Sequence, residues 1–105
     1  MPKIYLKSYV TEKGTMIAMC DAELIGKVLS EGKMELNLDR YADFYKGQLL
    51  EPAEAERNIK EEPSIYSANV VGNRSVNILI KNGIVGKEDV KQVEGVPFVH
   101  LYNVL

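Results

Sequence analysis

The chain has 105 residues, 46% of them hydrophobic and 27% charged, with a formal net charge of −2 at pH 7. This is the composition of a folded globular domain, and the length is that of one domain. The small net charge produces no field that draws the protein to DNA or to anionic membranes, so we expect neither as a partner. The single cysteine, Cys20, excludes an internal disulfide and favours a reducing, cytoplasmic location. Residues 1–5 lack the apolar region of a signal peptide.

The first third of the chain predicts a hairpin followed by a helix. Residues 3–10 alternate between apolar and polar side chains, which predicts a half-buried strand. Residues 11–14 predict the hairpin loop, and the almost wholly apolar residues 15–20 predict the returning strand. Because Asp21 is a good N-terminal capping residue, we expect a short helix over residues 22–29.

The middle of the chain predicts a strand, an aromatic connection and a helix. Residues 34–38 alternate and predict a third strand, whose inward side chains are Met34, Leu36 and Leu38. Residues 39–47 predict a turn or a single helical turn that three aromatic side chains attach to the core: Tyr41, Phe44 and Tyr45. Pro52 suits the first position of a helix over residues 52–61, which is mostly charged and solvated.

The most apolar long run, residues 69–82, predicts a long buried helix. Its apolar side chains recur at helical spacing, Lys81 has the charge that favours a helix C-terminus, and Gly83 can close the helix in a left-handed conformation. Gly72 lies inside this pattern and costs about 1 kcal/mol relative to alanine. This cost predicts that another backbone packs closely against Gly72.

The C-terminal part predicts two more strands, residues 90–94 and 98–104, joined by Gly95-Val96-Pro97. Pro97 belongs at the beginning of the second strand because it cannot donate a ladder hydrogen bond. The whole pattern predicts a single α+β domain over residues 1–105. In it, antiparallel hairpins and a third strand pack on the long buried helix, with one or two shorter helices.

Four short motifs together resemble a known family. They are Cys20-Asp21-x-Glu23-Leu24-Ile25-Gly26-Lys27, Phe44-Tyr45-x-Gly47, Ala68-Asn69-x-Val71-Gly72, and Gly83-x-Val85 followed by Gly95-Val96-Pro97. In this order and at this spacing they resemble the archaeal domain-of-unknown-function family 424. The resemblance implies a small cytosolic archaeal protein of unassigned activity, and it supplies no catalytic residue. Two positions depart from the family pattern: Asn73 stands where an acidic residue is usual, and Phe98 where histidine is frequent.

Cys20 and His100 are the residues that could perform nucleophilic chemistry. Cys20 precedes a predicted helix N-terminus, which lowers a thiol pKa, but the carboxylate of Asp21 beside it opposes a second negative charge. Free cysteine most often packs in the core, and we favour that role over a dyad with His100. One cysteine and one histidine cannot form a zinc site of four Cys and His ligands, so we expect no metal and no cofactor.

Asp21, Glu23 and Lys27 form a polar cluster around the first predicted helix. Glu23 and Lys27 are four residues apart, in the order that favours an ion pair on a helix. The cluster could hold a hard cation, but helix capping and a surface ion pair already explain these residue types.

The strand face formed by Lys3, Tyr5, Lys7 and Tyr9 is the most suggestive feature for function. Lysines interleaved with aromatic rings on a sheet are how several folds bind RNA, although edge strands also carry lysine to prevent aggregation. We therefore predict a non-enzymatic binding protein that serves RNA or the translation and ribosome machinery. The alternatives are a small enzyme that uses the Cys20 thiol, and a structural or adaptor subunit that binds another protein or forms a homo-oligomer.

Overall fold

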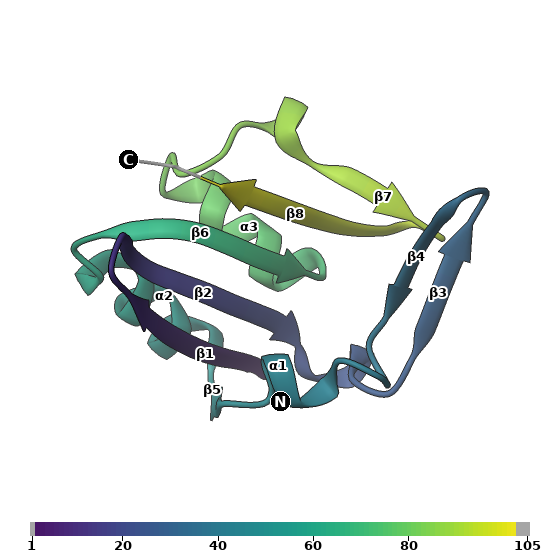
Figure 1. Ribbon diagram of the computed structural model, residues 1–105, viewed down its shortest axis with the longest axis horizontal. Helices are drawn as coiled ribbons and strands as arrows, with labels where there is room; N and C mark the ends of the chain where they lie inside the picture. The colour runs from purple at the N-terminus through teal and green to yellow at the C-terminus, as the bar shows by residue number, and fades with distance from the viewer. Residues whose placement is uncertain (1, 103–105) are drawn as a thin grey trace.

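The computed structural model describes residues 2–102, and its centre is a six-stranded sheet with strand order β5-β1-β2-β6-β8-β7 (Figure 1). The strands are β1 Ile4–Thr11, β2 Gly14–Asp21, β5 Gln48–Leu50, β6 Ile65–Val71, β7 Lys91–Val93 and β8 Val96–Tyr102. Neighbouring strands are antiparallel except for β2 and β6, which are parallel. The sheet is therefore mixed, and its two halves meet at the β2–β6 pair.

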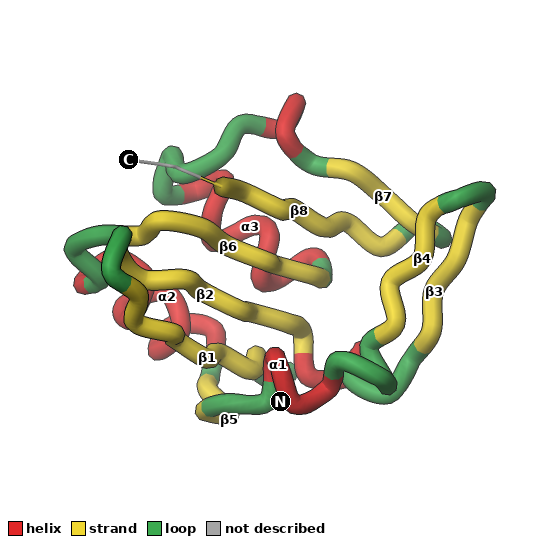
Figure 2. The backbone as a smooth tube through the Cα atoms, viewed as in Figure 1, coloured by secondary structure: helices red, strands yellow, loops and turns green. Residues whose placement is uncertain are grey.

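The remaining elements lie around this sheet (Figure 2). A separate two-stranded hairpin consists of β3 Val28–Glu31 and β4 Met34–Asn37. The helices are α1 Ala42–Tyr45, α2 Pro52–Glu61 and α3 Asn73–Lys81, with 3₁₀ turns at Ala22–Leu24 and Lys87–Asp89. Among residues 2–102, no helix is long and apolar enough to cross a membrane. The molecule is a compact domain of mixed α and β structure.

The two faces of the sheet are covered differently. Helices α2 and α3 lie behind the sheet in Figure 1, and alternate strand side chains, among them Ile4, Ile17 and Val70, pack against them in the main core. On the other face, a smaller apolar cluster forms where the β3–β4 hairpin and α1 meet the sheet. Because these two elements cover only part of that face, the remainder is open.

The long helix predicted over residues 69–82 is wrong in its first part. Asn69 to Val71 are the end of strand β6, and α3 begins at Asn73. Gly72 is not inside a helix but at its N-terminal cap, with φ of +107°. An apolar run that passes from a fully buried strand into a helix has no polar break, so periodicity alone could not find the boundary. The C-terminus is as predicted, since α3 ends at Lys81 and Gly83 has φ of +71°.

The helix predicted over residues 22–29 is also wrong. Only one 3₁₀ turn forms after Asp21, and residues 28–31 form strand β3, which pairs with β4. The third predicted strand therefore joins this hairpin and not the main sheet. Leu36 and Leu38 are buried as predicted, whereas Met34 is 39% exposed.

Other elements agree with the prediction. Strands β1 and β2, helix α2 and the helical turn α1 lie where the sequence placed them, and the strands β7 and β8 form the last hairpin. The turn between β7 and β8 is Glu94-Gly95, so Pro97 is the second residue of β8. Residues 103 and 104 of the last predicted strand lie outside the described residues. Strands β5 and β6 were not predicted.

Candidate binding site on the open sheet face

The sheet face opposite α2 and α3 carries a row of side chains from four strands. Cross-strand pairing aligns Lys7 of β1, Ala18 of β2, Asn69 of β6 and His100 of β8. We call this surface the open face, and its described side chains also include Tyr9, Met16 and Tyr102. Strand alternation explains the arrangement, because the residues between them point to the helices.

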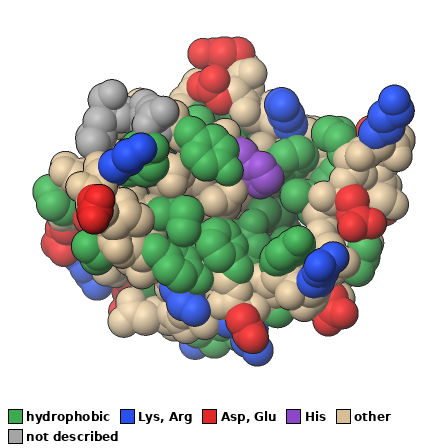
Figure 3. Space-filling model, viewed as in Figure 1, with side chains coloured by type: hydrophobic (Ala, Val, Ile, Leu, Met, Phe, Trp, Pro, Cys, Tyr) green, Lys and Arg blue, Asp and Glu red, His purple; other side chains and the backbone are tan. Residues whose placement is uncertain are grey.

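A pocket of about 430 Å³ lies between the open face and the segment that runs from β4 to α1. We call it the aromatic pocket; its lining is Met16, Glu35, Leu36, Asn37, Leu38, Tyr41, Phe44, Tyr45, Asn69, His100 and Tyr102. Small-molecule sites commonly have volumes of about 300–1,000 Å³ and a mostly apolar lining. Figure 3 shows apolar side chains gathered in the middle of this face, with the histidine beside them and charged groups around the edge. The pocket has the size and lining of a binding site for part of a larger ligand.

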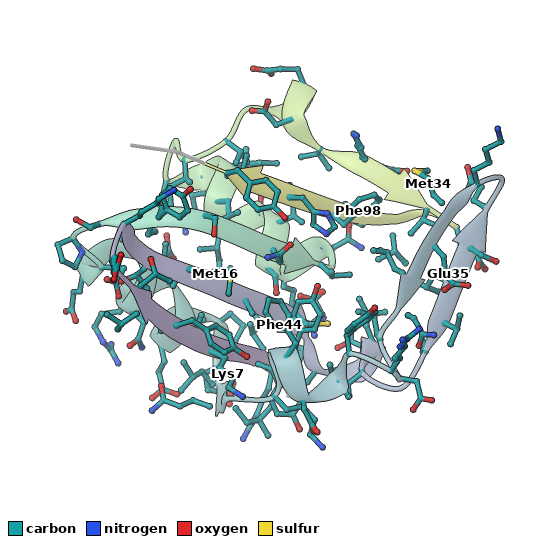
Figure 4. All side chains as sticks on the ribbon, viewed as in Figure 1. Lys7, Met16, Met34, Glu35, Phe44 and Phe98 are labelled. Carbon is teal, nitrogen blue, oxygen red and sulfur yellow. The ribbon has the colours of Figure 1, made fainter. Side chains whose placement is uncertain are left out.

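Helix α1 forms one wall of the pocket and is attached to strand β1. The rings of Tyr9 and Phe44 stack with centroids 5.3 Å apart, and the Tyr9 hydroxyl donates a 2.8 Å hydrogen bond to the Phe44 carbonyl. The Lys7 ammonium donates to the Asp43 carbonyl at 3.0 Å. Figure 4 shows Lys7, Met16 and Phe44 at this part of the sheet. Two of the four residues predicted to bind RNA therefore hold α1 in place.

None of the four predicted residues is in the pocket lining, and Tyr5 and Lys3 make other contacts. Tyr5 is half-buried between its cross-strand partners Cys20 and Leu49, and the backbone carbonyl of Lys3 accepts a hydrogen bond from Arg74. The accessible rings of the pocket come from residues that were not predicted for this role. Tyr102 is 69% exposed, and Tyr41 is 53% exposed, so the prediction that Tyr41 attaches its segment to the core is wrong. The alternation of β8 could have found Tyr102, but no local signal places Tyr41 beside the sheet.

His100 is at the edge of the pocket, with its ring 5.4 Å from that of Phe98. Partial burial lowers the pKa of His100 below its ordinary value of 6.5, and the positive charge of Lys91 lowers it further. The imidazole is therefore neutral at pH 7, with one nitrogen that donates and one that accepts a hydrogen bond.

Cys20 is fully buried, and its thiol donates to the Asp21 carbonyl at 3.4 Å. Burial, with the charges of Asp21 and Glu23, raises the pKa of Cys20 to about 12. The thiol is thus protonated at neutral pH, and a thiol in this form is a poor nucleophile. Cys20 and His100 share the open side of the sheet but are not neighbours, because β6 lies between their strands.

Asp21 caps a helix, but not the one predicted from the sequence. Its carboxylate accepts hydrogen bonds from the backbone N–H groups of Arg74 and Ser75, at 3.1 and 2.9 Å, and from the Ser75 hydroxyl at 2.8 Å. These groups are the first turn of α3, where unpaired N–H groups favour a negative charge. Glu23 pairs with the Arg74 guanidinium through two hydrogen bonds, and this lowers the pKa of Glu23. The predicted Glu23–Lys27 helix pair does not form, because no helix spans these residues.

The remaining motif residues stabilise connections between elements. The Gly72 N–H donates to the Pro97 carbonyl at 2.8 Å, which joins the ends of β6 and β8. The Gly26 N–H donates to the Leu38 carbonyl at 2.9 Å, and the Lys27 carbonyl accepts from the Leu38 N–H at 2.8 Å. Gly95 adopts φ of +77° in the β7–β8 turn.

Of the family-motif residues, Phe44, Tyr45 and Asn69 line the aromatic pocket. Within residues 2–102, no group of three or more His, Cys, Asp or Glu side chains is placed to hold a metal ion. The groups that this site offers a ligand are therefore aromatic rings, the amides of Asn37 and Asn69, the His100 imidazole and the Glu35 carboxylate.

Comparison with known proteins identifies relatives but no activity. The model of a family described as "protein of unknown function (DUF424)" matches residues 9–104. The fold is similar to the crystal structure of an uncharacterized conserved protein from Methanopyrus kandleri, with a TM-score of 0.79 and 24% sequence identity over 96% of this chain and 91% of that chain. No curated protein matches the sequence.

Proposed function

The chain belongs to the DUF424 family of proteins of unknown function, and we propose that it is a non-enzymatic protein that binds unpaired RNA on its open face. The observation that carries the proposal is the aromatic pocket, whose lining combines the accessible rings of Tyr41 and Tyr102 with polar groups from the sheet. Aromatic rings on a sheet bind single-stranded nucleic acid by stacking on its bases, and each stacked base contributes about 1–3 kcal/mol.

Arg40 and Lys91 are the cations near the pocket that could contact phosphates, while Lys7 is held against α1. The Arg40 guanidinium carbon is 5.5 Å from the centre of the Tyr41 ring, and the Lys7 ammonium is 5.3 Å from the centre of the Tyr9 ring. Lys91 is close enough to His100 to lower its pKa. A few cations on a protein of net charge −2 favour weak binding that depends on salt.

Tyr9 and Lys7 have an indirect role in this proposal, because both are bonded to α1. They hold α1 against β1, and α1 carries Phe44 and Tyr45 of the pocket wall. In this proposal, Lys7 and Tyr9 position α1, and Tyr41 and Tyr102 contact the RNA directly.

The test is the fluorescence anisotropy of a labelled single-stranded RNA, measured against protein concentration at about 50 and 200 mM salt. We expect Tyr102→Ala to weaken binding about 5- to 150-fold, the loss of one stacked base. Tyr66→Ala is the matched control, because Tyr66 is a half-exposed tyrosine outside the pocket lining. Equal loss in both variants, or no RNA binding at low salt, contradicts the proposal.

For the cellular partner, we propose RNA of the translation machinery. The small size of the chain and the buried, protonated thiol of Cys20 support a binding role over an enzymatic one. Sedimentation of the tagged protein in cell extract tests this part. Migration with ribosomal particles that ribonuclease abolishes supports it, and migration with free proteins in every condition contradicts it.

A further inference from the structure

Two neighbouring side chains in the aromatic pocket are free to recognise the edge of a flat ligand. Asn69 and His100 are direct cross-strand partners on β6 and β8, so their Cβ atoms are about 4.5–5.5 Å apart. The side-chain hydrogen bonds among residues 2–102 include neither the Asn69 amide nor the His100 imidazole. The rest of the pocket lining is mostly apolar, with Met16, Leu36 and the aromatic rings, and it also includes Glu35 and Asn37.

We infer that the aromatic pocket takes one unpaired adenine of the bound RNA, and that Asn69 determines this preference. The inference rests on the proposed function and deepens it, since it names the base that the same site selects. It follows from two properties of the pocket: its volume with a mostly apolar lining, and the hydrogen-bonding pattern of its polar groups.

The size of the pocket favours a purine over a pyrimidine. Its volume of about 430 Å³ exceeds what one small ring fills, and its walls are mostly apolar or aromatic. Hydrophobic stabilisation is proportional to the apolar area removed from water. A two-ring base therefore gains more hydrophobic stabilisation in this pocket than a one-ring base does.

The polar groups favour adenine over guanine. An asparagine amide offers one donor and one acceptor side by side, which matches the amino group and N7 of adenine. The corresponding edge of guanine has two acceptors and is read by arginine or lysine. The described lining of the pocket contains no arginine or lysine that could supply that pair of donors. His100 is neutral at pH 7 and adds one further donor and acceptor.

The experiment compares RNA oligomers of one length that consist of adenine, uracil or cytosine, together with a mixed oligomer that contains guanine. We expect the adenine oligomer to bind about 5- to 150-fold more tightly than the others, which is the discrimination that a bidentate amide–base pair provides. Asn69→Leu keeps the approximate size of the side chain and should remove the preference while stacking still binds all oligomers. Asn58→Leu on α2 is the matched control and should leave the preference unchanged.

Asn69→Asp keeps the shape of the side chain if the leucine variant does not fold. Its carboxylate lacks the donor, so the adenine preference should fall here too. Equal binding of all oligomers by the unmodified protein, or an unchanged preference in a folded Asn69 variant, overturns the adenine inference and leaves the RNA proposal standing. Absence of binding to every oligomer overturns both.

Discussion

At the scale of single residues, Asp21 and Gly72 form a contact that joins distant parts of the chain. Asp21 is 2% exposed, and its carboxylate is hydrogen-bonded to the first turn of α3. Gly72 precedes that turn with φ of +107°, and a Cβ atom there would collide with the Asp21 carboxyl group. The first and second halves of the sheet are thus held together by a contact that admits only a glycine at position 72.

Gly72→Ala should therefore lower the free energy of unfolding by about 2–4 kcal/mol, through backbone strain and the loss of the cap. Denaturant unfolding followed by circular dichroism measures this change. Gly83→Ala is the control, because Gly83 has φ of +71° but open space around its Cα, so strain alone costs about 1–2 kcal/mol. Equal destabilisation by both substitutions would show that the Asp21 contact contributes nothing.

The electrostatics of His100 provide a second prediction at this scale. Its pKa in the folded protein is below 6.5 because of burial and Lys91. The unfolded chain therefore binds a proton more readily, and His100 contributes stability that is complete above pH 6.5 and is lost as the pH falls. In an NMR titration, Lys91→Gln should move the His100 pKa upward, whereas Lys81→Gln on α3 should not. An unchanged His100 pKa in the Lys91 variant contradicts this account.

At the scale of elements, two hydrogen bonds join Glu94 to Ser30 and Glu31 and hold the β3–β4 hairpin against the sheet. The Glu94 carboxylate accepts from the Ser30 N–H at 2.6 Å, and the Glu94 N–H donates to the Glu31 carboxylate at 2.8 Å. Glu94 adopts φ of +50° in the turn, which directs its backbone and side chain at the hairpin. The hairpin supplies Leu36 to the aromatic pocket, so this contact also fixes a pocket wall.

Glu94→Ala should increase the amide hydrogen exchange of the hairpin, with the largest effect at Ser30, whose acceptor is removed. The free energy of global unfolding should fall by about 1 kcal/mol, because the one hydrogen bond that is lost is at the surface. Glu12→Ala in the β1–β2 turn is the control and should leave hairpin exchange unchanged. Unchanged exchange at Ser30 in the Glu94 variant would contradict a holding role.

The sequence predicts some of these elements well and others not at all. The alternation of apolar and polar side chains was sufficient to predict β1, and Pro52 marked the start of α2, because both signals are local. Strand β6 was missed, since its apolar residues continue into α3 with only Gly72 between them. The parallel β2–β6 pairing and the use of Asp21 by α3 join segments more than 40 residues apart, and no local pattern specifies such contacts.

The same distinction applies to the candidate site. The sequence predicted a lysine and tyrosine face on β1, and Lys7 and Tyr9 do lie on the open face. The helical turn α1 covers these residues, and this tertiary contact could not be inferred from strand periodicity. Asn69 was singled out as a motif residue, but its place in a pocket depends on strand β6, which was not predicted.

At the scale of the whole molecule, the sheet separates two functions. The face under α2 and α3 holds the main core, while the open face carries a pocket with accessible aromatic rings. Family-motif residues outside the pocket lining, such as Gly26, Gly72 and Gly95, lie at connections between strands and turns. We propose that the sheet has the main core on one side and a ligand-binding surface on the other, which is the central claim of our account.

The most direct measurement is a titration of the ¹⁵N-labelled protein with a single-stranded RNA at low salt, followed by amide chemical shifts. We predict that the shifts cluster on the open face, at Met16, Asn69, His100 and the α1 turn, with small changes in α2. Shifts confined to α2 and α3, or no shifts at saturating RNA, would contradict the assignment of binding to the open face.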